Sequence, residues 1–321
     1  RSYCHYRRLG RSAGTGCRMV RSTIRTIVLL LLIWGQTSCI REGLQECEEV
    51  YFITIKVVDM LTGEDITASR EVSHAILFVF DADEQYRYTV RADSNQVRQR
   101  IPIPITLKNT DHYWLSVWGN LDGNQCITQL EPSNTLDNPT VSASGKEGEN
   151  QSQTQDDLFF GIAQIGKSPI RNEEIIISRK NARMYLTVRG LPALHKAIDY
   201  YFTIHLNNNG YNFKGTPIPN AIVIKQNGIT LANNDFVSPS SFNLIHTDSS
   251  REDYATVNLY RRSDTEYGED ILIASINSDL NGNPIVLPAG RTTNLLIDLR
   301  QEISVHIKTS LWDKTEQWVE W

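Results

Sequence analysis

The sequence predicts an all-β protein made of two β-sandwiches in tandem behind an export signal. Short runs of alternating or continuous apolar residues recur along the chain, whereas helical spacing of apolar residues is scarce. Turn signals separate these runs, among them Asn209-Gly210, Asn227-Gly228 and Asn281-Gly282. Short strands that alternate with such turns are typical of sandwiches.

Residues 19–38 have the organisation of a secretory signal that ends at a cysteine. Two arginines precede the apolar run Ile27–Trp34, and small residues then lead to Cys39. At 1.5 Å per residue this run spans about 12 Å, whereas the hydrocarbon core of a bilayer is about 30 Å thick, so it does not predict a transmembrane helix. We expect lipid attachment at Cys39. A plain secreted form is the alternative, because Gln36 stands where leucine is usual.

Residues 1–18 are expected to be a non-native extension, because Met19 is the first methionine and no acidic residue precedes it. The first 38 residues hold 7 of the 32 Lys and Arg and none of the 37 Asp and Glu, so the rest has a net charge of −12 (25 minus 37). Such an acidic surface argues against a nucleic-acid partner. It also argues against membrane docking through a basic patch, which leaves the lipid as the membrane anchor.

Three cysteines remain beyond the signal: Cys39, Cys47 and Cys126. If Cys39 carries the lipid, Cys47 and Cys126 form an even pair in an oxidising compartment, and we expect a disulfide between them. Two buried free thiols are the alternative. On the chain-entropy description, a disulfide closing this loop is worth about 4–5 kcal/mol.

The first sandwich is expected over residues 39–178. Pro102 and Pro104 suit an edge strand or a strand end, because proline cannot donate to a β-ladder. The polar segment Pro132–Gln155 has no aromatic residue and predicts a long surface loop, with an inter-domain linker as the alternative. The expected strands are Tyr51–Val58, Ala75–Phe80, Tyr86–Val90, Val97–Ile105, His112–Trp118, Asp157–Gly161 and Glu174–Ser178.

The second sandwich is expected over residues 179–321, with a short helix near Pro192–Asp199. Its expected strands are Arg183–Val188, Tyr200–Leu206, Ala221–Lys225, Ala255–Tyr260, Ile271–Ile276, Thr293–Leu299, Ser304–Lys308 and Gln317–Trp321.

Two segments match ligand motifs but lack the structural context that those motifs need. Gly161–Ser168 fits the phosphate-loop pattern G-x-x-x-x-G-K-S, yet a strand and not a helix is expected to follow it. Asn277–Gly282 resembles half of a calcium loop, but its twelfth position is Pro288 instead of glutamate. We therefore do not expect Gly161–Ser168 to bind phosphate, and we expect Asn277–Gly282 to form a turn.

No residue pattern predicts catalysis, a cofactor or a metal. No G-x-S-x-G motif occurs, and no two histidines have the spacing of a local zinc site. Asp81 and Asp83 could act as paired carboxylates, but their place after a buried strand suits a turn equally well. Trp114 and Trp118 share one face of a strand, which favours core packing.

Five segments, in the same order, resemble the minor fimbrial anchor subunits of type V fimbriae found in Bacteroidales. The likeness spans residues 39–321. The segments are the lipidated start Cys39–Cys47 (C-x-x-E/D-x-L-x-x-C), Asp157–Gly161 (D-L-F-Y-G), Ile177–Val188 (R-x-x-A/N-R-I-x-V), Tyr201–Gly215 (N-x-x-Y-x-F-x-G) and Trp312-Asp313 near the end.

The resemblance implies two transthyretin-like (Greek-key) sandwich domains and a surface-exposed lipoprotein of the outer membrane. It implies a structural, non-enzymatic role at the base of a fimbria: the subunit would tether the fibre, limit its length and join the shaft subunit by strand complementation. As a hypothesis, the anchor keeps its strand Tyr51–Val58, because cleavage before this strand would sever the lipid at Cys39. Polymerisation would then stop at this subunit.

Two other functions remain open. A surface glycan-binding lipoprotein would need an exposed aromatic platform, for example Trp114 with Trp118 or Tyr211 with Phe213. A hydrolase would need a cleft that joins two carboxylates, such as those of the Asp81 and Asp83 pair.

Overall fold

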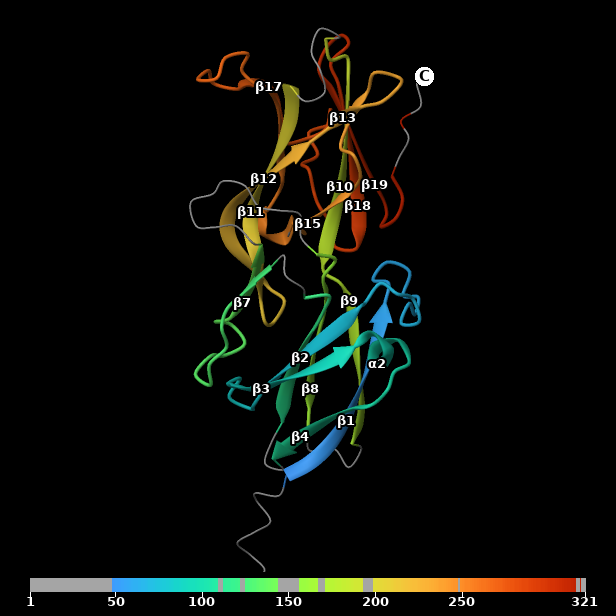
Figure 1. Ribbon diagram of the computed structural model, residues 1–321, viewed down its shortest axis with the longest axis vertical. Coiled ribbons are helices and arrows are strands. Elements are labelled where there is room, and N and C mark those ends of the chain that lie inside the picture. The colour runs from blue at the N-terminus through green and yellow to red at the C-terminus, as the bar shows by residue number, and fades with distance from the viewer. Residues whose placement is uncertain are drawn as a thin grey trace, which may run out of the picture. The chain divides into compact units, whose positions relative to one another are not determined.

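The computed structural model describes residues 48–108, 112–121, 125–143, 156–166, 171–192, 199–247, 249–315 and 318 (Figure 1). Within these ranges almost all regular structure is β, which confirms the predicted fold class. The short helical elements are α2 (Ser94–Arg98) and η2 (Ser249–Arg251). The strands are β1 (Glu48–Val58), β2 (His74–Phe80), β3 (Tyr86–Asp93), β4 (Ile103–Lys108), β5 (Tyr113–Gly119), β6 (Gln125–Ile127), β7 (Thr140–Ala143), β8 (Phe159–Ile165), β9 (Asn172–Arg179), β10 (Asn181–Arg189), β11 (Tyr200–Asn212), β12 (Pro217–Asn227), β13 (Ile229–Thr230), β14 (Phe236–Val237), β15 (Phe242–Ile245), β16 (Thr256–Arg261), β17 (Ile271–Ile276), β18 (Arg291–Asp298) and β19 (Ser304–Leu311).

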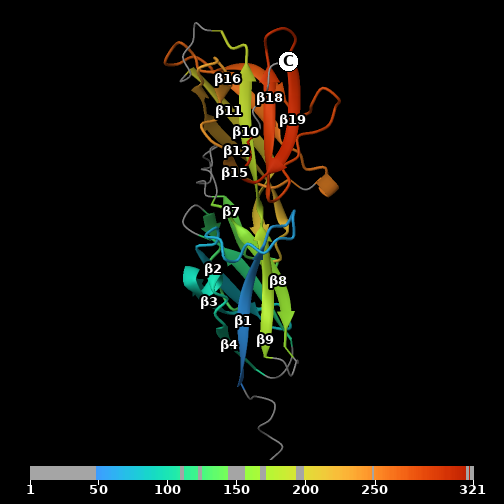
Figure 2. The same ribbon diagram turned by 90° about the vertical axis from the view of Figure 1, so that its right-hand side faces the viewer.

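The first sheet has the order β3-β2-β5-β8-β9-β1-β4. Strands β8 and β9 are paired only at Phe159↔Arg179 and Phe160↔Ser178, so the sheet folds over at this point (Figure 2). As a result, β9, β1 and β4 cover one side of a hydrophobic core, and β3, β2, β5 and β8 cover the other. Within this sheet β1 runs parallel to β9 over seven residue pairs, from Phe52↔Asn172 to Val58↔Ser178.

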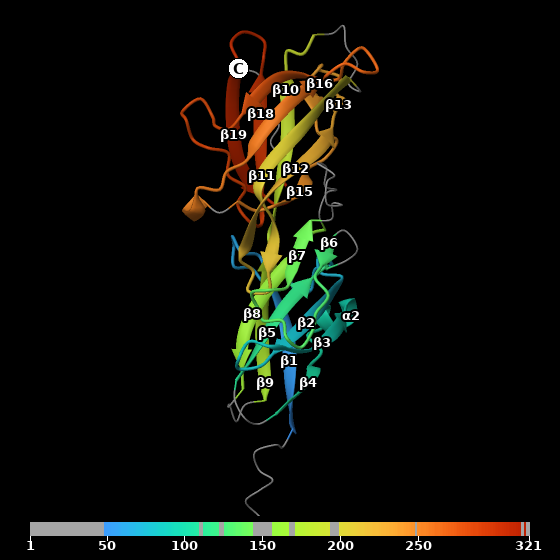
Figure 3. The same ribbon diagram turned by 90° about the vertical axis from the view of Figure 1, so that its left-hand side faces the viewer.

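Two further sheets enclose a second core. The second sheet has the order β13-β14-β10-β18-β19, with β15 beside β10, and the third has the order β17-β16-β11-β7-β6, with β12 beside β11. Strands β6 and β7 precede β8 in the chain, yet they extend the third sheet through the pair Tyr211↔Val141 (Figure 3). The division of the chain at residues 178 and 179 stays a prediction.

The predicted strand Val97–Ile105 is wrong. Its first residues belong to the helix α2, whose N-cap Asp93 accepts a hydrogen bond from the Gln96 amide (2.9 Å), while the Gln96 side chain accepts one from the Asp93 amide (3.0 Å). This reciprocal capping box satisfies amides that a helix start otherwise leaves unpaired. The strand proper is β4, an edge strand that contains Pro104, as proline predicts.

The predicted loop Pro132–Gln155 also contains a strand that was missed, β7. Burial alternates along this short strand, because Val141 and Ala143 are buried and the residue before each is only partly buried. Strands β13, β14 and β15 were missed too, and each has only two to four residues. Most of the predicted helix near Pro192–Asp199 and of the predicted strand Gln317–Trp321 lies outside the described residues.

We expect Asp93→Ala to lower the free energy of unfolding by about 1 kcal/mol, because the variant leaves the Gln96 amide without its cap. Urea denaturation of the purified protein measures this. Gln96→Ala removes only the returning bond and should have a smaller effect. Equal stability of Asp93→Ala and the unmodified protein would show that the capping box does not stabilise this segment.

Candidate functional site: the first strand and the sheet junction

The strand β1 is a full member of the first core. Its inward side chains are those that the alternating pattern predicts, and each is at most 3% exposed: Tyr51, Ile53, Ile55 and Val57. Burial of one such side chain is worth about 1.5–3 kcal/mol. Removal of β1 would therefore open the first core along its whole length.

A loop after β1 holds the end of the strand. The Thr67 hydroxyl accepts a hydrogen bond from the Val57 amide (2.8 Å) and donates one to the Asp65 carboxylate (2.7 Å). The Asp65 carboxylate also pairs with the Arg100 guanidinium. Hydrogen bonding from Thr67, followed by that from Arg100, holds the pKa of Asp65 well below its usual value. Asp65 is therefore ionised in the folded protein, and its carboxylate stabilises the loop that binds the end of β1.

The guanidinium of Arg179, at the end of β9, is buried and has several partners. Its side chain is 5% exposed, and it donates to both carboxylate oxygens of Asp157 (Nε to Oδ1 2.8 Å, Nη2 to Oδ2 2.9 Å). It also pairs with the Glu71 carboxylate. Burial opposes the charged form, but the hydrogen bond and charge of Asp157, together with the charge of Glu71, raise the pKa of Arg179. Arg179 therefore stays charged.

Aromatic rings complete the surroundings of this guanidinium. Its Cζ lies 4.7 Å from the ring centre of Phe159 and 4.1 Å from that of Trp312. Trp312 is 5% exposed, and its ring also contacts the guanidinium of Arg183, at 4.0 Å. Cation–π contacts of this kind strengthen where water is excluded. The residue that follows β19 is thus fixed against the connection between β9 and β10.

Only Lys180 separates β9 from β10, and its backbone is bonded on both sides. Its amide donates to the carbonyl of Leu158 (2.7 Å), and its carbonyl accepts from the Tyr211 hydroxyl (3.2 Å). The neighbouring Asn181 side chain accepts from the Leu158 amide (3.2 Å). Tyr211 in turn stacks on the His246 ring, with centroids 5.4 Å apart. We call these bonds, together with the Arg179 contacts, the sheet junction.

Aromatic packing joins the first sheet to the turn after β11. The ring centroid of Phe213 lies 4.6 Å from that of Phe78 and 6.4 Å from that of Trp118. Gly215 follows at φ +75°, and an added Cβ would lie 2.3 Å from the Phe160 ring. Only glycine therefore permits this approach.

The structure buries most of the rings proposed as a glycan platform. Trp118, Tyr211 and Phe213 are fully buried, and Trp114 is partly buried on the same strand face as Trp118. The prediction of core packing for Trp118 is confirmed. These rings do not form an exposed platform.

The two aspartates weighed for catalysis form a turn. The Asp81 carboxylate accepts hydrogen bonds from the Asp83 amide (3.0 Å) and the Gln85 amide (2.8 Å), and it pairs with Arg87. The Asp81 carboxylate therefore stabilises the turn before β3, and the interpretation of this pair as a turn is the one that fits.

The two ligand motifs are likewise structural in the residues described. Gly161 lies inside β8, and an added Cβ would meet the Ile176 carbonyl oxygen at 2.1 Å, so glycine allows two strands to approach. In the calcium-like segment, the Asp279 carboxylate accepts from the amides of Asn281 and Asn283 (both 2.8 Å), as a turn requires. Among the described residues, no group of three or more His, Cys, Asp and Glu could hold a metal ion.

Three predicted site residues remain untested. Cys39 and Cys47 lie outside the described residues, and Cys126 is described only by its backbone in β6. The lipid and the disulfide therefore stay predictions. Over the described ranges, no helix has the length and apolarity to cross a bilayer.

The most connected residues of the junction received no role from sequence reasoning. Asp157 and Arg179 lie in segments that carry the family resemblance, as do Trp312 and Gly215. The available signal was the alternation of β9, which places Arg179 on the same face as the buried Ile175 and Ile177. Such a residue indicates a buried charge that needs a partner, but it does not identify the partner.

The fold is shared with a solved protein of the fimbrial anchor class. The solved fimbrial anchor protein Mfa2 from Porphyromonas gingivalis superposes with a TM-score of 0.60 at 15% identity, over 83% of this chain and 98% of that chain. The chain belongs to the family of fimbrillin-A associated anchor proteins Mfa1 and Mfa2, which it matches over residues 44–318. The family that the sequence motifs predicted is therefore confirmed.

Two curated relatives agree with this membership. The major fimbrium anchoring subunit FimB of one Porphyromonas gingivalis strain is 26% identical over 316 residues, covering 92% of this chain and 97% of the relative. FimB of a second strain is 27% identical over 308 residues, with the same coverage of both chains.

We expect Arg179→Met to lower the free energy of unfolding by about 3–5 kcal/mol, because it leaves two carboxylates without their shared cation. Chemical denaturation measures the loss. Arg300→Met is the matched control: Arg300 pairs with Asp298 at the surface and is about half exposed, so its loss should cost at most about 1 kcal/mol. Equal losses in the two variants would contradict the role given to the junction.

We expect the stability difference between the unmodified protein and Asp65→Asn to depend on pH. Because the folded-state pKa of Asp65 lies below its unfolded value, the carboxylate stabilises fully above that unfolded value of 3.8, and the advantage is lost as pH falls toward the folded pKa. Thermal unfolding of both proteins from pH 7 downward measures this. A difference that stays constant below pH 3.8 would refute it.

Proposed function

We propose that this protein is the anchor subunit at the base of a fimbria. A lipid on Cys39 tethers it to the outer membrane at the cell surface, and strand complementation joins it to the shaft subunit. It limits the length of the fibre because growth ends on it. Family membership supports the role, and the buried position of β1 between β9 and β4 is the observation that carries it.

The distance along the chain suits a short tether. Cys39 stands nine residues before Glu48, the first residue of β1. Even fully extended, such a linker reaches only about 30 Å. A lipid at Cys39 would hold the first sandwich close to the membrane surface.

The place of β1 in the first sheet supports the limit on length. β1 lies between β9 and β4 and fills the core with alternate side chains. Strand complementation needs a vacant strand position, and β1 already fills this one. Cleavage ahead of β1 would also release the protein from its lipid. A subunit that keeps this strand thus accepts no further subunit there, and the fibre ends.

The glycan-binding alternative has no observation in its favour. Three of the four rings named for it are fully buried in a further hydrophobic cluster, between the first sheet and β11. Mutation of these rings would test folding and not recognition.

We expect Cys39→Ala to release fimbriae from cells, because the variant lacks the lipid acceptor. Shaft protein should move from the cell-bound fraction to the medium, and electron microscopy should show longer fibres. Gln36→Leu is the control: it restores the usual residue three positions before the acceptor, so it should leave the fimbriae attached. Fimbriae of normal length that stay attached in Cys39→Ala would exclude the proposed anchor.

A further inference from the structure

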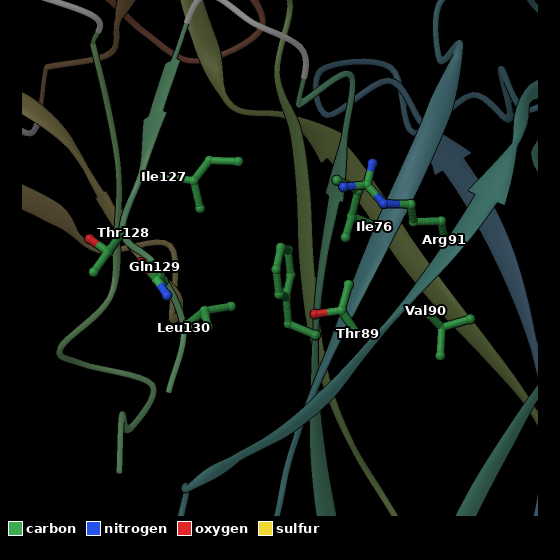
Figure 4. A pocket seen from close by; sticks show the side chains of 9 residues that line it. Ile76, Thr89, Val90, Arg91, Ile127, Thr128, Gln129 and Leu130 are labelled. Atoms are coloured by element: carbon green, nitrogen blue, oxygen red, sulfur yellow. The ribbon is translucent and has the colours of Figure 1, made fainter. Parts of the chain in front are cut away.

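A groove lies between the first and the third sheets, apart from the position filled by β1. Its volume is about 710 Å³, and Figure 4 shows its two walls facing each other. One wall is formed by Ile76 and Phe78 of β2 with Thr89 and Arg91 of β3. The opposite wall is Ile127 at the end of β6 and the three residues that follow it.

Each side of this groove includes a strand at the edge of its sheet. β3 is the last strand of the first sheet, and β6 is the last strand of the third sheet. β6 pairs with β7 on its other side, and Thr128 continues that pairing by donating its amide to the Thr140 carbonyl (3.0 Å). Edge strands present backbone donors and acceptors to any extended segment that reaches them. Here residues of two such edge strands line one groove.

The chain itself shows that the edge beside β3 accepts an extended segment. Thr135 forms an antiparallel bridge with Gln85, just before β3. The Tyr86 amide donates to the Asn134 carbonyl (2.8 Å), and the Leu136 amide donates to the Glu84 carbonyl (3.2 Å). This pairing ends where β3 begins, so the rest of the β3 edge borders the groove.

One charge marks the groove. The Arg91 side chain is exposed, and within the described residues no acidic side chain pairs with it. Among the residues that line the groove, Arg91 is the one with a charged side chain. A carboxylate on the bound segment would complement it.

We propose that this groove binds an extended segment of the shaft subunit by β-augmentation along β3. Apolar side chains of the segment contact Ile127 and Leu130, and an acidic side chain pairs with Arg91. The proposal rests on the proposed anchor function and adds the docking surface to it. It explains how a subunit whose first strand is already in place still holds a partner: the contact uses a separate pair of edges.

The test is a double variant, Arg91→Glu with Ile127→Lys, expressed in fimbriated cells. Both side chains are exposed, so we expect an unchanged melting temperature. Shaft protein shed into the medium should rise about ten-fold or more, as the loss of an interface centre implies. The matched control is Arg70→Glu with Ile176→Lys, which changes the same two residue types at exposed positions outside the groove and should shed no more than the unmodified protein.

Hydrogen exchange supplies the second measurement. In the isolated complex of anchor and shaft subunit, amides of β3 and of residues 125–130 should exchange more slowly than in the anchor alone. Normal retention in the double variant, or unchanged exchange in both segments, would overturn the groove while leaving the anchor function intact. If the unmodified protein neither holds fimbriae on the cell nor forms a complex with the shaft subunit, the anchor function itself would be refuted. A dimer of the purified anchor that the double variant abolishes would assign the groove to a second copy and overturn the proposal.

Discussion

One buried cation organises the middle of this molecule. The Arg179 guanidinium needs partners because an unpaired charge in the interior is strongly unfavourable. Those partners come from distant parts of the chain: Glu71 from the loop before β2, Asp157 from the segment before β8, and Trp312 from the residue after β19. Since each must reach the same planar group, the positions of three segments are coupled. The short connection at Lys180 depends on the same arrangement, because Leu158 follows Asp157 directly.

The fold class was predictable because alternation is a local property. Ile271–Ile276 was predicted with the bounds that the structure has, and the buried face of β1 was predicted residue by residue. The failures are elements too short to show a period. β7 is stable because β6 and β11 flank it, and α2 is stable because Asp93 caps it. Neither cause appears in a hydrophobicity pattern.

The sheet junction was not predictable from sequence for a related reason. Arg179 is 22 residues from Asp157 and 108 from Glu71, and no local pattern relates such positions. The segments that carry the family resemblance nevertheless meet here, since Asp157, Arg179, Tyr211 and Trp312 each belong to one of them. Motifs that look unrelated along the chain thus describe a single region in space. The family could be identified from them before their shared role could be.

The parallel pairing of β1 and β9 has a mechanical consequence. Under the proposed function, tension from the lipid enters at the N-terminal end of β1 and passes through its pairing with β9 into the rest of the first sheet. Because both strands run in the same direction, this force pulls them past each other lengthwise. The backbone bonds along all seven pairs then share the strain instead of opening one after another. Forced unfolding is governed by the rate of that step, so shear loading suits a subunit that must resist a dragging fibre.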